Sequence, residues 1–327
     1  MLRYLIRRIF TMALSLLVIS ALIFFIIKLP PGDFLTTQIE ELRAQGEQVN
    51  AKQIEFLRKR YGLDQPAYMQ YLGWLGGLLQ GDFGQSFEHE ESVSKIIGEV
   101  MPLTIILKFA TVFFIYLVAF PIGIYSATHQ YSWGDHGLTF LGFLGLATPN
   151  FLLALIMLYL ANSWFGISIG GLMDREFIGA PWSWGKILSV ANHMWVPVLV
   201  IGTAGTAAMI RRLRANLLDE LQKQYVTTAR AKGLSEGKLL VKYPLRMALN
   251  PFIADIGALL PELVSGAVIV SVVMSLPTTG PILLSALQSQ DMYLAGSFLM
   301  FLAALTVFGM FLSDVALALL DPRIRLE

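Results

Sequence analysis

An uncharged apolar run over residues 9–27 opens the chain, directly after a basic N-terminus that includes Arg7 and Arg8. Its length is close to the roughly 20 residues that a helix needs to cross the hydrocarbon layer of a bilayer. The run is long for the apolar part of a signal peptide, and Lys28-Leu29-Pro30-Pro31 offers no small-residue cleavage site. We therefore expect a retained first membrane-spanning helix.

Runs of this kind recur along the sequence. Further spans are expected over residues 109–128, from 138 onward, and over 187–210, about 251–277 and about 293–320. The third run stays uncharged as far as Met173, too long for one upright helix, so its glycine-rich end at 166–171 is expected to form a loop or partial re-entry. Only 14% of the residues are charged, against about a quarter in soluble domains. The sequence predicts an all-α integral membrane protein with about six transmembrane helices.

The distribution of charge predicts the orientation. Basic residues are concentrated between the fourth and fifth expected spans, at Arg211, Arg212, Arg214, Lys223, Arg230, Lys232, Lys238, Lys242 and Arg246. Acidic residues outnumber basic ones in the segment after the first span. Because positive charge near the membrane marks the cytoplasmic side, both termini and the basic loop are expected in the cytoplasm.

Three regions follow from this topology. Residues 1–29 form the N-terminal tail and first span, 30–101 an external (periplasmic) cap segment, and 102–327 a five-helix core with a cytoplasmic loop at 211–250. Within the cap, Asn50-Ala51-Lys52-Gln53 is typical of a helix-capping box, and Gly62 is typical of a helix end. We therefore expect a small folded cap there.

The basic loop has the pattern of a helix, a tight turn and a second helix. Gly233 can adopt the left-handed conformation that ends a helix, Ser235 can cap the next one, and Pro244 limits its length. Ala229 lies four residues before Gly233 on one helical face, which predicts a smooth patch for close approach by another protein, with Arg230 and Lys232 beside it.

Two simpler interpretations exist for such a loop. A basic loop between spans is commonly held at the lipid surface. A helix-turn-helix that binds DNA is disfavoured, because the loop has no room for a three-helix domain and lacks a pattern of base-reading side chains.

The stretch Thr228-Ala229-Arg230-Ala231-Lys232-Gly233-Leu234 resembles the cytoplasmic signature loop of binding-protein-dependent ABC importer permeases, in the oligopeptide, dipeptide and nickel branch. The similarity covers nearly the whole chain. It includes Pro31-Gly32-Asp33, Leu63-Asp64-Gln65-Pro66, Gly81-Asp82-Phe83-Gly84-Gln85-Ser86 and, at the end, Asp321-Pro322-Arg323-Ile324-Arg325.

This resemblance implies a type I ABC importer permease in a bacterial inner (plasma) membrane. The loop residues Thr228, Ala229, Arg230, Ala231, Lys232, Gly233 and Leu234 would then form the coupling helix that docks onto an ATPase subunit. The implied partners are a second homologous permease, two ATPase subunits, an external solute-binding protein and the lipid bilayer, with no nucleic acid. The chain itself would be non-catalytic and without a cofactor, because ATP and Mg would be bound by the ATPase subunits. Its function would be the uptake of oligopeptides, dipeptides or related small solutes.

The motif positions depart from the family in ways that bear on the cargo. Pro277-Thr278-Thr279-Gly280 replaces the common Pro-Gly-x-Gly, and Gln290-Asp291-Met292-Tyr293 replaces Arg-Asp-Tyr-Pro. Ser271 stands where the family often has an acidic residue, which weakens any expectation of a site for a peptide amino group. An oligosaccharide-carrying branch remains an alternative.

Three carboxylates fall inside expected spans: Asp255, Glu262 and Asp314. Because burial of charge in a membrane is costly, they are candidates for the pathway or for ion pairs, and in an ion-coupled secondary transporter or channel they would form a relay. No P-loop, catalytic triad pattern or cysteine is present, so neither nucleotide binding, catalysis by this chain nor a thiolate metal site is expected.

Overall fold

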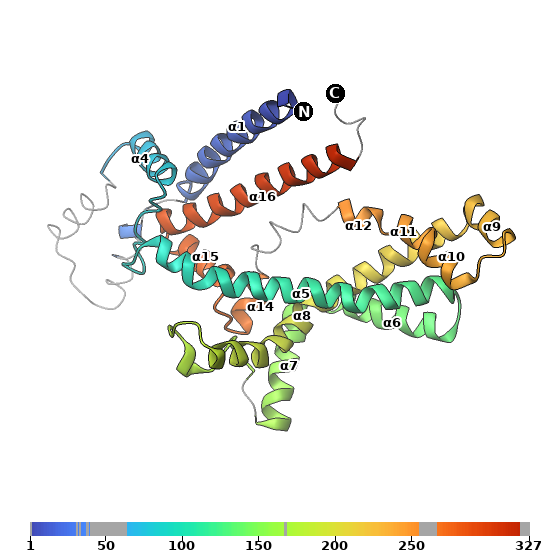
Figure 1. The fold of residues 1–327 in the computed structure, drawn as a ribbon. Coiled ribbons are helices and arrows are strands. Elements are labelled where there is room, and N and C mark those ends of the chain that lie inside the picture. Colours follow the sequence, from blue (N-terminus) through green and yellow to red (C-terminus); the bar gives the residue numbers. More distant parts are fainter. Residues whose placement is uncertain are drawn as a thin grey trace. The chain divides into compact units, whose positions relative to one another are not determined.

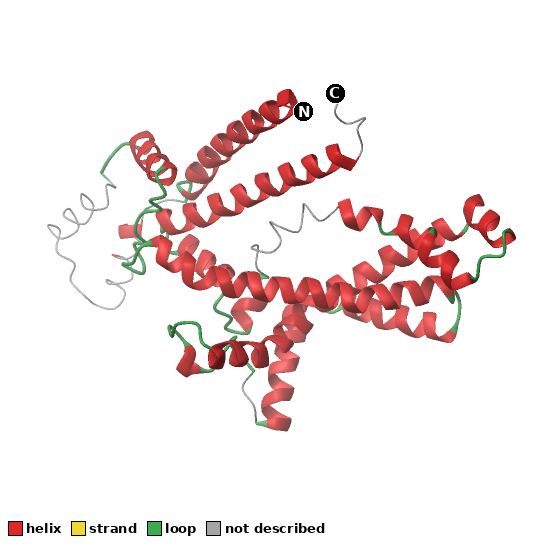
Figure 2. Ribbon diagram, in the orientation of Figure 1, coloured by secondary structure: helices red, strands yellow, loops and turns green. Residues whose placement is uncertain are grey.

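The computed structural model describes residues 2–30, 32, 34–36, 39, 64–166, 169–254 and 267–320. Regular structure within these ranges is helical apart from one isolated β-bridge, between Gln85 and Ser92 (Figure 2). The chain divides into two compact units, one made of Met1–Pro102, Gly257–Gly266 and Thr278–Glu327, the other of Leu103–Ile256 and Ala267–Pro277. The expected all-helical class is confirmed over the described residues.

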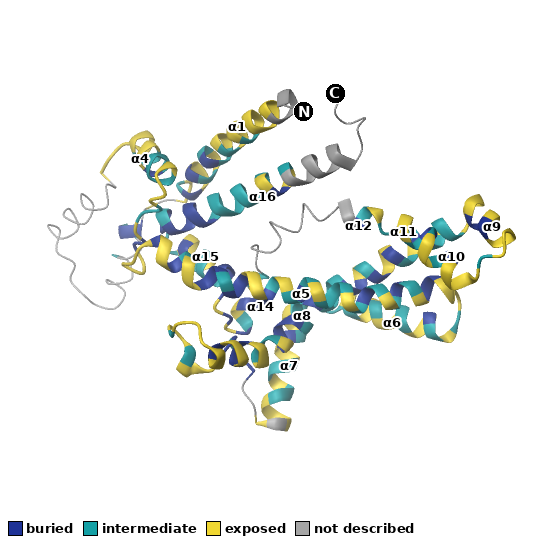
Figure 3. Ribbon diagram, viewed as in Figure 1, coloured by how far each residue is buried: buried dark blue, intermediate teal, exposed yellow. Residues whose placement is uncertain are grey.

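The first unit joins both ends of the sequence. Its helices are α1 (Leu2–Ile27), α4 (Ala67–Leu79), the start of α5 (Val93–Thr128), α15 (Thr279–Gln288) and α16 (Met292–Leu320). Helices α1 and α16 lie side by side (Figure 1). Phe24 of α1, Trp74 of α4 and Phe298 of α16 are buried in one apolar cluster, whereas other large apolar side chains of α1, such as Phe10 and Leu14, are exposed. Figure 3 shows exposed residues along much of α1. An exposed apolar face of this kind suits contact with lipid.

The second unit contains the rest of the helices. They are the remainder of α5, α6 (Trp133–Ala147), α7 (Asn150–Phe165), η1 (Arg175–Phe177), α8 (Trp184–Leu221), α9 (Gln224–Ala231), α10 (Glu236–Lys242), α11 (Pro244–Ala248), α12 (Asn250–Ala254) and α14 (Val268–Val273). One apolar core includes Leu107, Val200 and Met274, and a second, around Leu213 and Phe252, packs α8 against α11 and α12.

The described helices agree with most of the expected spans. Those long and apolar enough to cross a membrane are Ile6–Ile27, Val93–Thr128, Trp184–Leu221 and Met292–Phe311, and the bent pair α6–α7 makes a fifth if it is one span. The fifth expected span includes residues 255–266, which lie outside the described ranges, as does the capping box at 50–53. The count of six spans and the side of the termini therefore stay predictions.

Two helices are longer than expected. Helix α5 begins at Val93 rather than near 109, because Val93, Ile96 and Val100 form a buried stripe although Lys95 and Glu99 interrupt the apolar run. Helix α8 continues to Leu221 because Leu213 and Leu217 extend its buried face beyond the arginines. A search for uncharged runs finds the apolar part of such helices and misses their amphipathic ends.

The third expected span is broken at Pro149, before its glycine-rich end. Helices α6 and α7 meet at 98° around Thr148 and Pro149. Thr148 has an extended backbone, which is the conformation that a following proline favours. Gly166 then ends α7 with φ +63°, so the expected loop does begin at the glycine-rich segment.

Candidate functional site

The candidate site is the hairpin of α9 and α10, residues 224–242, at one end of the second unit (Figure 1). Helix α9 ends in a Schellman motif: Gly233 N donates to Arg230 O at 3.0 Å, and Leu234 N donates to Ala229 O at 3.4 Å. Gly233 has φ +81°, the left-handed conformation expected for it. The turn therefore favours a glycine because of its backbone conformation.

A bidentate ion pair closes the turn from the outside. Arg230 Nε donates to Glu236 Oε1 at 2.6 Å and Arg230 Nη2 donates to Oε2 at 3.0 Å. Hydrogen bonding with Glu236 raises the pKa of Arg230, and the same contact lowers the pKa of Glu236. The sequence predicts Arg230 beside the docking patch, but a spacing of six residues across a turn does not reveal its pairing with Glu236.

The inside of the hairpin is a small apolar core. Val226, Ala229 and Leu239 are buried in it, and Leu234 packs against them. Ala229 is only 7% exposed, so its methyl group faces the interior of the hairpin and does not form the outward patch predicted from helical spacing. That part of the prediction is wrong, because the residue pattern of one helix does not show which of its faces a second helix will cover.

Ser235 occupies the N-cap position of α10, as expected, but its side chain makes no capping hydrogen bond. Helix α10 ends at Lys242, and Pro244 begins α11, so the predicted limit on its length is confirmed. The boundaries of the hairpin were thus readable from sequence, whereas its stabilising side-chain contacts were not.

The hairpin is also attached to the helix that leads into it. Tyr225 Oη donates a hydrogen bond to Glu220 Oε2 at 2.5 Å, which ties α9 to the last turn of α8. Burial, together with this hydrogen bond to a carboxylate, raises the pKa of Tyr225 to about 12. The hairpin and the end of α8 therefore share a polar contact in addition to the chain itself.

The outer face of α10 carries a shallow groove. Its lining residues are Leu234, Gly237, Lys238, Val241 and Lys242. Val241 is 64% exposed, and a side chain at Gly237 would meet nothing within 4 Å. An open groove with apolar and basic edges suits contact with another protein. Gly237 and Val241 were not among the predicted site residues, although they lie four residues apart and therefore on one face of α10.

The other predicted site residues are not placed. Asp255 and Glu262 lie outside the described residues, as does the side chain of Asp314, so their role in a pathway stays a prediction. The part of the chain that is described contains no group of three or more histidine, aspartate or glutamate side chains that could hold a metal ion.

In the first unit, the loop Gly81–Ser86 is fixed to the residues before α16. Asp291, fully buried, accepts hydrogen bonds at Oδ2 from Ser86 Oγ and Phe87 N, both at 2.6 Å, and at Oδ1 from Leu294 N at 3.0 Å. Asp291 is the one position of its four-residue motif that keeps the family residue. A carboxylate suits this position because its two oxygens accept several hydrogen bonds that would otherwise be left unmade in a buried place.

Comparisons with known proteins decide the family. The protein family described as binding-protein-dependent transport system inner membrane component matches residues 119–326. The family of the N-terminal part of such membrane components matches residues 1–108. The chain belongs to this family. It is a permease of the ABC importers, a multi-pass protein of the inner membrane, and it is non-catalytic because ATP is hydrolysed by partner subunits.

Relatives of known name match along almost their entire length. The permease is 34% identical to the oligopeptide transport system permease protein AppB of Bacillus subtilis, over 98% of this chain and 99% of that protein. It is 30% identical to the di/tripeptide transport system permease protein DppB of Pseudomonas aeruginosa, over 99% of each. It is 27% identical to the nickel import system permease protein NikB of Staphylococcus aureus, over 98% of this chain and 91% of that protein. The resemblance seen in the motifs is confirmed.

Proposed function

We propose that this permease forms one half of a translocation pathway with a second, homologous permease, and that two ATPase subunits drive it through the hairpin. An external solute-binding protein delivers the cargo, and the six spans place both termini in the cytoplasm. The segment from Thr228 to Leu234 forms the contact with the ATPase through its exposed residues, extended by the groove of α10, while Ala229 packs inside the hairpin. Asp255, Glu262 and Asp314 stay candidates for the pathway or for ion pairs.

The observation that supports this proposal is the construction of the hairpin. A loop that only lay on a lipid surface would need basic residues but no defined shape. This one is set by a Schellman turn, an apolar core and a bidentate ion pair, and it is tied to α8 through Tyr225. A rigid projection fixed to a long membrane helix can transmit displacement, whereas a slack tether cannot.

Coupling requires that the nucleotide states of the ATPase bind the two pathway states with different free energies. The groove residues Leu234 and Val241 offer apolar contacts, and Lys238 and Lys242 add charge. Family membership favours this ATP-driven mechanism over an ion-coupled relay.

The test is Gly237→Trp in the complete transporter, reconstituted in proteoliposomes with its binding protein. Position 237 lies in a helix and a side chain there meets open space, so bulk is added to the groove without backbone strain. We expect ATP-driven uptake to fall by about tenfold or more while the permease still inserts into the membrane. Wild-type uptake would contradict the assignment of the hairpin.

A matched control separates bulk from the shape of the turn. Asparagine tolerates the left-handed conformation better than most residues with a side chain, so Gly233→Asn is expected to retain most uptake. Gly233→Trp adds bulk and strain together, because φ is +81° there, and would lower uptake for either reason.

The cargo class that the relatives support best is peptides, because two of the three relatives named above carry names of oligopeptide and di/tripeptide systems. Oligosaccharides are the second candidate, favoured by Ser271, which is only 1% exposed and supplies no carboxylate at its position. Competition of labelled tripeptides and oligosaccharides for the purified binding protein distinguishes the two.

A further inference from the structure

An ion pair with a buried carboxylate joins α6 to α8, away from the hairpin. Arg214 Nε donates to Asp135 Oδ1 at 3.0 Å, and Arg214 Nη2 donates to Asp135 Oδ2 at 2.8 Å. The side chain of Asp135 is 2% exposed and that of Arg214 is 27% exposed. A bidentate pair of this kind fixes direction as well as distance. The two helices are therefore held in one register at this point.

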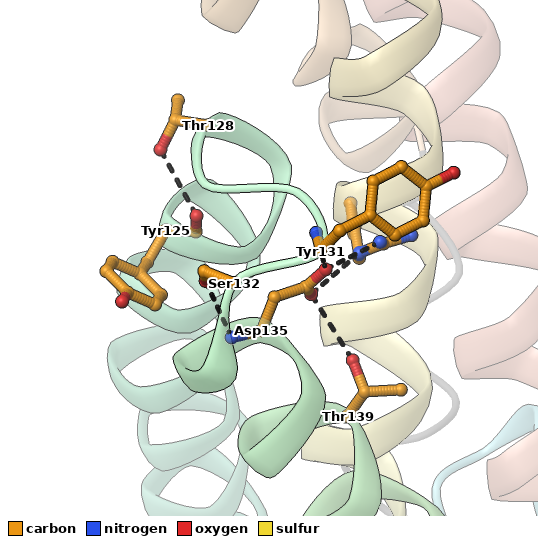
Figure 4. Close-up of polar contacts among 7 residues, drawn as sticks. Tyr125, Thr128, Tyr131, Ser132, Asp135 and Thr139 are labelled. Carbon is orange, nitrogen blue, oxygen red and sulfur yellow. Dashed lines mark hydrogen bonds and ion pairs between the residues drawn. The ribbon is translucent and has the colours of Figure 1, made fainter.

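Asp135 also holds the turn between α5 and α6 (Figure 4). Tyr131 N donates to Asp135 Oδ2 at 3.0 Å, and Asp135 N donates to Ser132 Oγ at 3.1 Å. Tyr131 has φ +63°, a conformation that costs free energy for a residue with a side chain. The carboxylate thus stabilises an unfavourable turn and pairs with Arg214 at the same time.

On the other side of the pair, Arg214 belongs to the part of α8 that carries the hairpin. Leu213 and Leu217, next to it on the helix, are fully buried against α11 and α12. The same helix then reaches Glu220, which accepts the hydrogen bond from Tyr225 of the hairpin. One continuous helix therefore bears the contact with the hairpin at its end and the contact with α6 at Arg214.

We infer that Asp135 and Arg214 are the positioning residues that pass a displacement of the hairpin on to α6, and through the bend at Thr148 and Pro149 to α7. The inference rests on the proposed function of the hairpin. Apolar contacts between helices can slide by small steps, but separating this pair would leave a buried carboxylate without its counter-ion. Helices α6 and α8 consequently move as one body during the transport cycle.

The first test is Asp135→Asn in the complete transporter with its binding protein. Asparagine keeps the size of the side chain, and the partly exposed Arg214 can reach water. We expect the variant to assemble with the ATPase subunits and to hydrolyse ATP, while uptake per ATP falls by about tenfold or more. A purely structural role would lower assembly and uptake together and leave this ratio unchanged. An unchanged ratio would overturn the inference.

The matched control is Asp219→Asn, the same substitution at an exposed aspartate of α8. It removes one negative charge, as Asp135→Asn does, so we expect uptake per ATP to stay within about twofold of wild type. An equal fall in this control would assign the effect to net charge and overturn the role of the pair.

A second experiment uses the absence of cysteine from the natural sequence. The double variant Asp135→Cys/Arg214→Cys loses the ion pair and is expected to be uncoupled when reduced. A short thiol-specific cross-linker, added after reconstitution, replaces the pair by a covalent link and should restore uptake per ATP to at least about half of wild type. If the cross-linked transporter is no better than the reduced one, α6 and α8 do not move as one body.

The two proposals fail in different ways. Normal uptake by Gly237→Trp would remove the hairpin from the coupling mechanism, and the inference would fall with it. Loss of coupling in Gly237→Trp together with failure of the cross-link to restore uptake would leave the hairpin in place and reject only the link through Asp135.

Discussion

Asp291 and Ser86 lie 205 residues apart in the sequence, and the hydroxyl of Ser86 donates to the Asp291 carboxylate at 2.6 Å inside the first unit. The same oxygen, Oδ2, accepts from the backbone of Phe87. This contact fixes the loop Gly81–Ser86 against the start of α16, and it joins two family motifs that sequence analysis had treated separately. We therefore expect the first unit to be sensitive to substitution at Asp291.

The first prediction concerns Asp291. In Asp291→Ala the donors of Ser86, Phe87 and Leu294 lose their acceptor in a buried place, so we expect the free energy of unfolding to fall by about 3 kcal/mol or more. Thermal unfolding of the purified permease in nanodiscs measures this. Asp82→Asn, at an exposed carboxylate of the same loop, is the control and should change stability by less than about 1 kcal/mol. Equal effects of the two variants would contradict the role of Asp291.

The second prediction concerns the glycines of α8. A methyl group at Gly202 would lie 2.7 Å from Phe114 Cδ1, part of a rigid ring, whereas at Gly205 it would lie 2.7 Å from Ile115 Cδ1, the end of a flexible chain. Small residues allow membrane helices to approach closely. We therefore expect Gly202→Ala to lower stability by about 1–2 kcal/mol and Gly205→Ala to lower it less.

Gly137→Ala is the control for these two variants. A methyl group there meets nothing within 4 Å, so the better helix propensity of alanine should leave stability unchanged or slightly higher. The three melting temperatures, measured under one set of conditions, should follow the order 137, 205, 202 from highest to lowest. If Gly202→Ala is as stable as Gly137→Ala, the close packing at Phe114 is not a constraint.

The third prediction is a pH dependence of the hairpin turn. The pKa of Glu236 is held below its ordinary value of 4.5 by Arg230, so the ion pair stabilises the turn above that pH and is lost as the pH falls through the lowered pKa. The pKa of Tyr225 is raised from 10.0 to about 12, so its bond to Glu220 persists below pH 10 and is lost as the pH rises through about 12. The hairpin should therefore be equally ordered from about pH 5 to about pH 10.

A nitroxide attached at Lys232→Cys reports this, because the natural chain has no cysteine. Its spectrum should stay constant across the neutral range and become more mobile in acid. In Glu236→Gln the ion pair is missing at every pH, so the label should be mobile throughout. A label in Glu236→Gln that matches the unsubstituted turn at neutral pH would show that Arg230 and Glu236 do not order it.

Local features of the structure followed from the sequence by itself. Apolar runs located the membrane helices, and Gly233 and Pro244 marked the boundaries of the hairpin, because helix length and backbone conformation depend on residues close together in the chain. The break at Pro149 has the same local cause, because the residue before a proline is biased away from the helical backbone conformation.

The tertiary structure alone decided which side chains meet. Nothing near Asp135 in the sequence points to Arg214, 79 residues later, and nothing near Ser86 points to Asp291. In the structure Ala229 faces inward, because α10 covers the face of α9 that helical spacing predicts to contact a partner protein. Such pairs depend on how helices pack, and packing is set by the shape and burial of surfaces that are remote from one another in the chain.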